Sequence, residues 1–122
     1  MIKILHIPIY RCSVVFLIDE TKEGFLKWAN KYKEQLTDDD RLTICREYDS
    51  LHTDGFCVHT DGNDYVARID SNGSKGYIAH EIFHIADSIL SGRNYTYGGT
   101  NEPVAYLIEF LTNEYYKMIK QL

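Results

Sequence analysis

The sequence predicts an α+β fold, a small twisted and mostly antiparallel sheet with three helices. Short segments rich in β-branched and aromatic residues alternate with longer segments whose apolar residues recur every three or four positions. The chain of 122 residues is long enough to bury one hydrophobic core, and it contains no repeat or linker-like tract. We therefore expect a single domain spanning residues 1–122.

Two apolar segments at the start of the chain, residues 3–9 and 13–18, predict a pair of strands. The turn between them falls at Tyr10-Arg11. Residues 22–36 predict an amphipathic helix, because apolar residues recur on one face at helical spacing. That face consists of Phe25, Trp28, Ala29, Tyr32 and Leu36.

The middle of the chain predicts three further strands. Residues 42–48 form the first, and a loop over residues 50–55 follows it. Residues 56–60 and 65–70 are separated by a turn at residues 61–63 that contains Asp-Gly, which predicts a hairpin.

An amphipathic helix of about 17 residues follows the hairpin. Asn72-Gly73-Ser74 supplies a turn and an N-cap residue, and Gly92 is well placed as the C-terminal stop. The apolar residues at helical spacing are Ile78, Ile82, Ile85 and Ile89.

This helix carries the motif His80-Glu81-Ile82-Phe83-His84. Residues four apart lie on one face of a helix, so the two imidazoles can be directed at one point, with Glu81 beside it. In the HExxH pattern, two histidine nitrogens hold a zinc ion and the glutamate acts on water. A surface helix with two histidines and no metal is the alternative.

A zinc ion in a hydrolytic site has three protein ligands and one open position. Glu102 is the predicted third ligand, since it opens a second predicted helix whose N-cap is Thr100 or Asn101 and whose first turn contains Pro103. A glutamate is also favoured at this position by the helix dipole alone. The buried stripe of this helix is predicted to be Val104, Leu107, Ile108, Leu111, Tyr115 and Met118.

An HExxH helix followed by a glutamate on the next helix resembles the gluzincins, the thermolysin-like branch of the zincin metallopeptidases. The segments HEIFHIADSIL and NEPVAYLIEFL look most like the minimal gluzincins, small proteins often encoded by phages and prophages; the match covers residues 65–115. The resemblance implies a zincin-like fold and a zinc-dependent hydrolase. It also implies His80, His84 and Glu102 as ligands and Glu81 as the general base.

The chain departs from the thermolysin-like pattern at Tyr106, where that branch has an aspartate that orients the first histidine. A phenol can hydrogen-bond an imidazole N–H, so Tyr106 is a candidate partner of His80, with a core aromatic as the alternative. Arg93, Tyr95 and Tyr97, between the two predicted helices, are candidate donors for an oxyanion.

The resemblance also implies how a substrate is aligned. In zincins the strand before the active helix generally lies at the sheet edge, where an extended peptide can pair with it. Residues 65–70 hold that place in this sequence and are expected to form the edge strand. A peptide or protein is therefore the expected substrate. The alternative is a non-catalytic protein-binding module of zincin fold that keeps zinc for its stability.

Composition and charge argue against several other classes of function. The net charge is −5, the sequence contains no basic stripe, and the run Asp38-Asp39-Asp40 is interpreted as a solvated loop. The lack of a basic stripe means that no nucleic-acid partner is expected. No membrane partner is expected either, because no apolar run reaches membrane-spanning length. Cys12, Cys45 and Cys57 are irregularly spaced and odd in number, and the first residues lack the features of a signal peptide. Reduced cysteines and a cytoplasmic location are the expectation.

Overall fold

The computed structural model describes residues 1–31, 36–50, 54–93 and 102–122. Within these residues, four strands form one sheet and four α-helices pack around it, which confirms the α+β class. No helix in the described part of the chain is long and apolar enough to cross a membrane.

Two hairpins build the sheet. β1 (Ile2–Ile7) and β2 (Cys12–Leu17) are antiparallel, and a 3-10 turn, η1 (Pro8–Tyr10), connects them. β3 (Phe56–His59) and β4 (Tyr65–Arg68) are also antiparallel, as the sequence predicts. β2 and β4 pair in parallel, so the sheet is mixed and has the order β1-β2-β4-β3.

β4 lies inside the sheet, with β2 on one side and β3 on the other. The prediction that residues 65–70 form the edge strand is therefore wrong. Tyr65, Val66 and Ala67 are all almost completely buried, and strands covered on both faces are typical of a sheet interior. β3 is the edge strand on the side of the HExxH helix.

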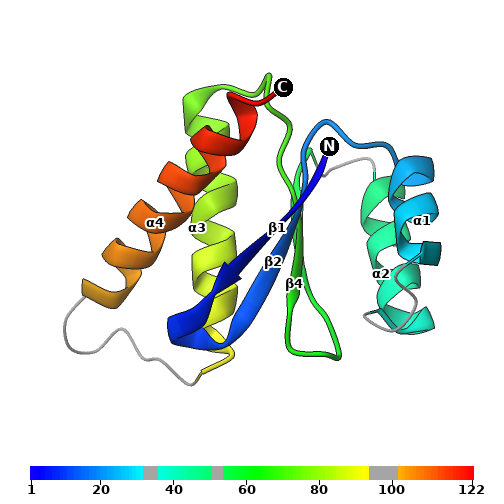
Figure 1. Ribbon diagram of the computed structural model, residues 1–122, viewed down its shortest axis with the longest axis horizontal. Helices are drawn as coiled ribbons and strands as arrows, with labels where there is room; N and C mark the ends of the chain where they lie inside the picture. Colours follow the sequence, from blue (N-terminus) through cyan, green and yellow to red (C-terminus); the bar gives the residue numbers. More distant parts are fainter. Residues whose placement is uncertain (32–35, 51–53, 94–101) are drawn as a thin grey trace.

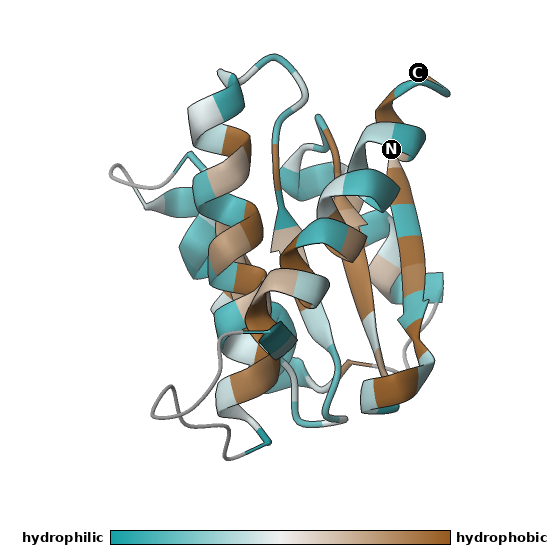
Figure 2. Ribbon diagram, turned by 90° about the vertical axis from the view of Figure 1, so that its left-hand side faces the viewer, coloured by the Kyte–Doolittle hydropathy of each residue, from teal (hydrophilic) through white to brown (hydrophobic). Residues whose placement is uncertain are grey.

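The helices form a layer on each face of the sheet (Figure 1). α3 (Lys75–Ser91) and α4 (Glu102–Ile119) cover one face, and α1 (Lys22–Lys31) and α2 (Asp38–Asp49) cover the other. Each layer closes its own hydrophobic cluster, one centred on residues such as Phe16, Ile82 and Tyr115 and the other on Leu17, Phe25 and Ile44. Apolar and polar positions alternate along the helices in Figure 2, as expected of helices with one buried face.

α1 and α2 differ in how well the sequence predicts them. The helix predicted over residues 22–36 is confirmed as far as Lys31, and residues 32–35 lie outside the described residues. The strand predicted over residues 42–48 is wrong, because these residues belong to α2.

The start of α2 explains this error. The Thr37 hydroxyl accepts a hydrogen bond from the Asp40 N–H, and the Asp40 carboxylate accepts one from the Thr37 N–H, both at 3.1 Å. This capping box fixes the helix start within the acidic run that was interpreted as a loop. Asp40 is 5% exposed and also accepts from the Asp61 N–H at 3.1 Å, so it joins α2 to the β3–β4 turn.

Candidate metal and catalytic site

α3 forms over the residues that the sequence predicts. The Ser74 hydroxyl caps its first turn by accepting from the Tyr77 N–H at 3.1 Å, and Gly92 follows its last residue. The buried stripe of isoleucines packs against the sheet, which places the HExxH residues at the side of the helix nearest β3. The helix is therefore a rigid support for these side chains.

His80 and His84 converge as the motif predicts. Their Nε2 atoms lie 3.1 Å apart, and both side chains are exposed. Tetrahedral zinc with Zn–N distances of about 2.0–2.1 Å brings two ligand nitrogens to about 3.3 Å from each other. The imidazole pair therefore fits two neighbouring ligand positions of a zinc ion.

Glu102 is not brought together with this pair. Among the described residues, which include Glu102, no group of three or more His, Cys, Asp or Glu side chains could hold a metal ion. Residues 94–101, which precede Glu102 and include its predicted N-cap, lie outside the described residues. The role of Glu102 as third ligand stays a prediction.

Glu81 is the buried acid of the site. Its side chain is 9% exposed and makes no hydrogen bond to a described residue. Burial raises the pKa of the Glu81 carboxyl above its ordinary value, and the nearby Asp54 charge raises it further, while His80 and His84 lower it. A carboxylate with a raised pKa is better suited to accept a proton near neutral pH.

Gly55, at the start of β3, is a site residue that the sequence reasoning missed. A Cβ on Gly55 would lie 2.8 Å from Cδ of Glu81 and 2.8 Å from the carbonyl oxygen of Arg68. Only a residue without a side chain lets β3 approach Glu81 this closely. A glycine next to a predicted strand is a known signal of close backbone approach, so this contact could have been anticipated.

An open hollow of about 530 Å³ connects these residues. α3 supplies Tyr77, the HExxH residues and Ser88, and β3 with its preceding residues forms the opposite wall. The complete lining is Glu47, Asp54, Gly55, Phe56, Cys57, Tyr77, His80, Glu81, His84 and Ser88.

Cys57 in this wall is a neutral thiol at physiological pH. Burial raises the pKa of Cys57 to about 12, and a hydrogen bond with Ser88 acts in the opposite direction. His59, two residues further along β3, does not line the hollow. Its ring stacks on Tyr65 at 4.6 Å, and its Nε2 lies 3.0 Å from Asn63 Oδ1. These contacts leave Cys57 and His59 as packing residues.

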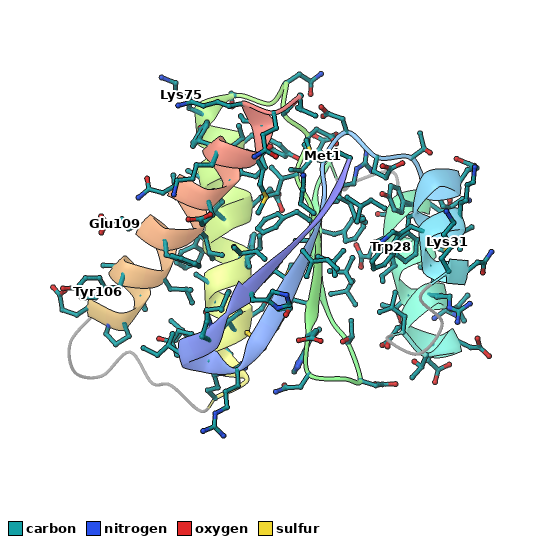
Figure 3. All side chains as sticks on the ribbon, viewed as in Figure 1. Met1, Trp28, Lys31, Lys75, Tyr106 and Glu109 are labelled. Atoms are coloured by element: carbon teal, nitrogen blue, oxygen red, sulfur yellow. The ribbon has the colours of Figure 1, made fainter. Side chains whose placement is uncertain are left out.

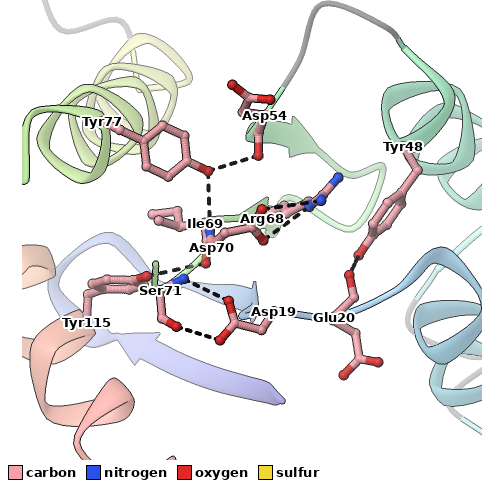
Figure 4. A network of polar contacts seen from close by, with 10 residues as sticks. All are labelled: Asp19, Glu20, Tyr48, Asp54, Arg68, Ile69, Asp70, Ser71, Tyr77 and Tyr115. Carbon is pink, nitrogen blue, oxygen red and sulfur yellow. Dashed lines mark hydrogen bonds and ion pairs between the residues drawn. The ribbon is translucent and has the colours of Figure 1, made fainter. Parts of the chain in front are cut away.

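Tyr77 connects the three elements around the hollow (Figure 4). Its hydroxyl donates to the Asp54 carbonyl oxygen at 2.9 Å and accepts from the Asp70 N–H at 3.3 Å. The first turn of α3 is thereby tied to the residue before β3 and to the residues after β4. This bridge sets the distance between the HExxH residues and the edge strand.

The remaining predicted residues lie elsewhere. Tyr106 is 68% exposed on the outer side of α4 and lines an apolar hollow with Ile9 and Phe110, so it does not orient His80 (Figure 3). The Arg93 guanidinium donates to the Tyr10 carbonyl oxygen and, at 3.1 Å, to the Tyr65 hydroxyl, which fastens the end of α3 to the sheet. The other two oxyanion candidates, residues 95 and 97, lie outside the described residues.

Comparisons with models of protein families, with curated proteins and with solved structures found no match. The residues of the site themselves therefore indicate its chemistry.

Proposed function

We propose that this protein is a zinc-dependent metallopeptidase of the gluzincin type. The observation that carries the proposal is the convergence of two imidazole Nε2 atoms, 3.1 Å apart, beside a buried carboxylate in an open hollow. Two histidines and a carboxylate at this spacing are the core of a hydrolytic zinc site.

Glu81 favours catalysis over a purely structural zinc site. A structural site needs only ligands, and it has no need of an additional carboxylate that lines the hollow without a hydrogen bond to a described residue. Glu81 follows His80 directly in the helix, so its carboxylate approaches the site from the β3 side and is not in the ligand pair. A general base accounts for this placement, whereas a structural role does not.

The reaction follows from these positions. His80 and His84 would hold the ion, with Glu102 as the predicted third ligand. When bound, zinc supplies a Lewis acid that polarises the scissile carbonyl and acidifies water. Glu81 takes a proton from water as the water oxygen bonds to the carbonyl carbon, and delivers it to the amide nitrogen as the C–N bond breaks. The products are a carboxylic acid and an amine.

β3 aligns the substrate in this proposal, in place of β4. β3 pairs with β4 on one side only, and no other described strand pairs with its outer edge. Cys57 and Phe56 of this strand line the same hollow as His84. An extended peptide that adds to this edge would place its backbone along the wall opposite the histidines.

The second candidate is a zinc-stabilised module that binds proteins without cleaving them. The observation in its favour is that no complete set of three ligands is found among the described residues. A site that holds zinc less firmly would still stabilise the fold, because metal affinity is coupled to folding.

Glu81→Gln separates the two candidates. The variant should keep one zinc ion per chain and the parent fold, because Glu81 is not a ligand, while peptide cleavage falls about 100- to 10,000-fold. Zinc is measured by elemental analysis after purification without added metal, and cleavage on a broad peptide library. Glu109→Gln, on the exposed outer side of α4, is the matched control and should cleave as the parent does. Equal cleavage by Glu81→Gln and the parent would contradict the proposed role.

A further inference from the structure

The hollow that holds the HExxH residues continues into two others. Asp54 and Tyr77 line both the catalytic hollow and a neighbouring one, and Asp70 and Asn72 line that second hollow and a third. The third hollow lies where β2 and β4 end and their chains leave towards opposite faces of the sheet. Together they form one polar trough, which we call the acidic trough.

The acidic trough carries many carboxylates and little positive charge. Its acidic residues besides Glu81 are Asp19, Glu20, Glu47, Asp54 and Asp70. Arg68 is the only lysine or arginine among the described residues that line it. Arg68 pairs with Asp70 at 3.3 Å and lies over the Tyr48 ring at 4.9 Å, so its charge is already engaged (Figure 4).

The carboxylates differ in their partners along the trough. At the far end, Asp19 accepts hydrogen bonds from the Ser71 N–H at 2.8 Å and from the Ser71 hydroxyl at 2.5 Å. At the catalytic end, Glu47 and Asp54 form no ion pair with a described residue. The charge that lacks compensation is thus concentrated beside the histidine pair.

Glu81 makes this end of the trough a site for a cation. It is more than nine-tenths buried, lines the hollow together with Asp54 and Glu47, and has no hydrogen bond to a described residue. Three carboxylates with no lysine or arginine in the same hollow repel one another unless positive charge is brought in. Zinc at the histidines supplies part of it, and a bound substrate is the remaining source.

We infer that the acidic trough selects peptides that carry a lysine or arginine side chain next to the scissile bond. This inference rests on the proposed function and names its substrate class. A peptide on the outer edge of β3 passes Asp54, which lies just before that strand. There the aliphatic stem of a basic side chain lies against Tyr77, and its charged end reaches the carboxylates of Asp54 and Glu47.

The binding test uses the zinc-loaded Glu81→Gln protein, which binds the peptide without cleaving it. This variant keeps Asp54 and Glu47, the two carboxylates assigned to the basic side chain. Labelled peptides that differ at one position, with lysine, norleucine or glutamate, are compared by fluorescence anisotropy, and the position is moved along the peptide. At the best position, lysine should bind about tenfold more tightly than norleucine, and glutamate more weakly than both. The lysine preference should shrink as salt increases, because the pair is partly exposed.

Asp54→Asn and Glu47→Gln, each added to this background, test the residues. Each should lower lysine-peptide affinity about fivefold and leave norleucine-peptide affinity unchanged. Glu109→Gln removes the same charge outside the trough and should change neither affinity. An equal effect of all three would show that only net charge acts, and loss of zinc in Asp54→Asn or Glu47→Gln would show a ligand. Either result overturns the inference.

Cleavage by the parent separates this inference from the proposed function. Cleavage without a preference for basic peptides would reject the inference and keep the peptidase. Tight, selective binding of lysine peptides without any zinc-dependent cleavage would keep the inference and reject the peptidase. Neither cleavage nor selective binding would reject both.

Discussion

At the scale of single residues, Gly55 is the position in the site that has the least room for a side chain. A methyl group at this position meets Cδ of Glu81 and the Arg68 carbonyl oxygen, each at 2.8 Å. The carbonyl belongs to the sheet backbone and cannot move away, so the added carbon must displace Glu81 or the start of β3. The absence of a side chain at Gly55 therefore allows Glu81, the proposed general base, to keep its position.

We predict that Gly55→Ala destabilises the protein by about 1–3 kcal/mol through overpacking and lowers kcat/KM by more than the loss of folded protein accounts for. Urea unfolding and peptide cleavage at a temperature where the variant is folded measure the two effects. Gly76→Ala is the control, because a Cβ there meets only the Ser74 hydroxyl at 3.9 Å in the first turn of α3. The control should be neutral or slightly stabilising. Identical behaviour of the two variants would remove the special role of Gly55.

The HExxH residues show what the sequence could predict at this scale. A four-residue spacing on one helix fixes a geometry that needs no tertiary information, so the approach of His80 to His84 was predictable. The place of Tyr106 was not, because it depends on how α4 rotates against α3. Tyr106 lies outside the predicted buried stripe of α4, and its side chain is turned outward instead of towards the histidines.

At the scale of elements, α2 shows a local signal prevailing over a hydrophobic pattern. Residues 42–48 alternate well enough to suggest a strand, yet Thr37 and Asp40 close a capping box just before them. Thr37→Ala should cost about 1 kcal/mol in unfolding free energy, as typical of lost N-caps. Asp39→Asn, in the same first turn without a capping bond, should cost clearly less. Equal losses in chemical denaturation would mean that the cap does not hold α2.

The edge strand allows a paired test of substrate alignment. Thr60 N–H donates to the Asp64 carbonyl oxygen at 2.8 Å, and hydrogen-bonded positions alternate along an antiparallel pair. By this alternation Val58 bonds to β4, while the N–H groups of Cys57 and His59 point away from β4 towards the free edge.

We predict that Cys57→Pro retains the fold but weakens peptide binding, since it removes a donor only from the outer edge. Val58→Pro should destabilise the protein much more, because it breaks the ladder to β4. Cys57→Ala controls for the lost thiol and should bind peptides as the parent does. Circular dichroism and peptide anisotropy provide the two measurements. Undiminished peptide binding by a folded Cys57→Pro protein would show that substrates do not pair with β3.

At the scale of the whole molecule, sheet order decides where the substrate can lie. The hairpins were predictable from their turns, but the parallel pairing of β2 with β4 joins segments that are distant in the sequence. That pairing moves β4 to the interior and leaves β3 at the edge. No local pattern in residues 65–70 distinguishes these two arrangements, since either strand of a hairpin can take the interior or the edge position in a larger sheet.

α3 and α4 pack against each other on one face of the sheet. If Glu102 is the third ligand, a zinc ion joins α3 to α4, and binding to the folded chain alone raises its stability. At a free zinc concentration 100 times the dissociation constant, the gain is about 2.7 kcal/mol, which for this size corresponds to a rise in Tm of roughly 10 °C.

Zinc-dependent melting of ligand variants provides the measurement. His80→Ala and His84→Ala should lose most of the zinc-induced rise in Tm, and Glu102→Ala should lose it comparably, whereas Glu81→Gln should keep it. A Glu102→Ala protein that retains both full zinc occupancy and the rise would place the third ligand elsewhere in the chain.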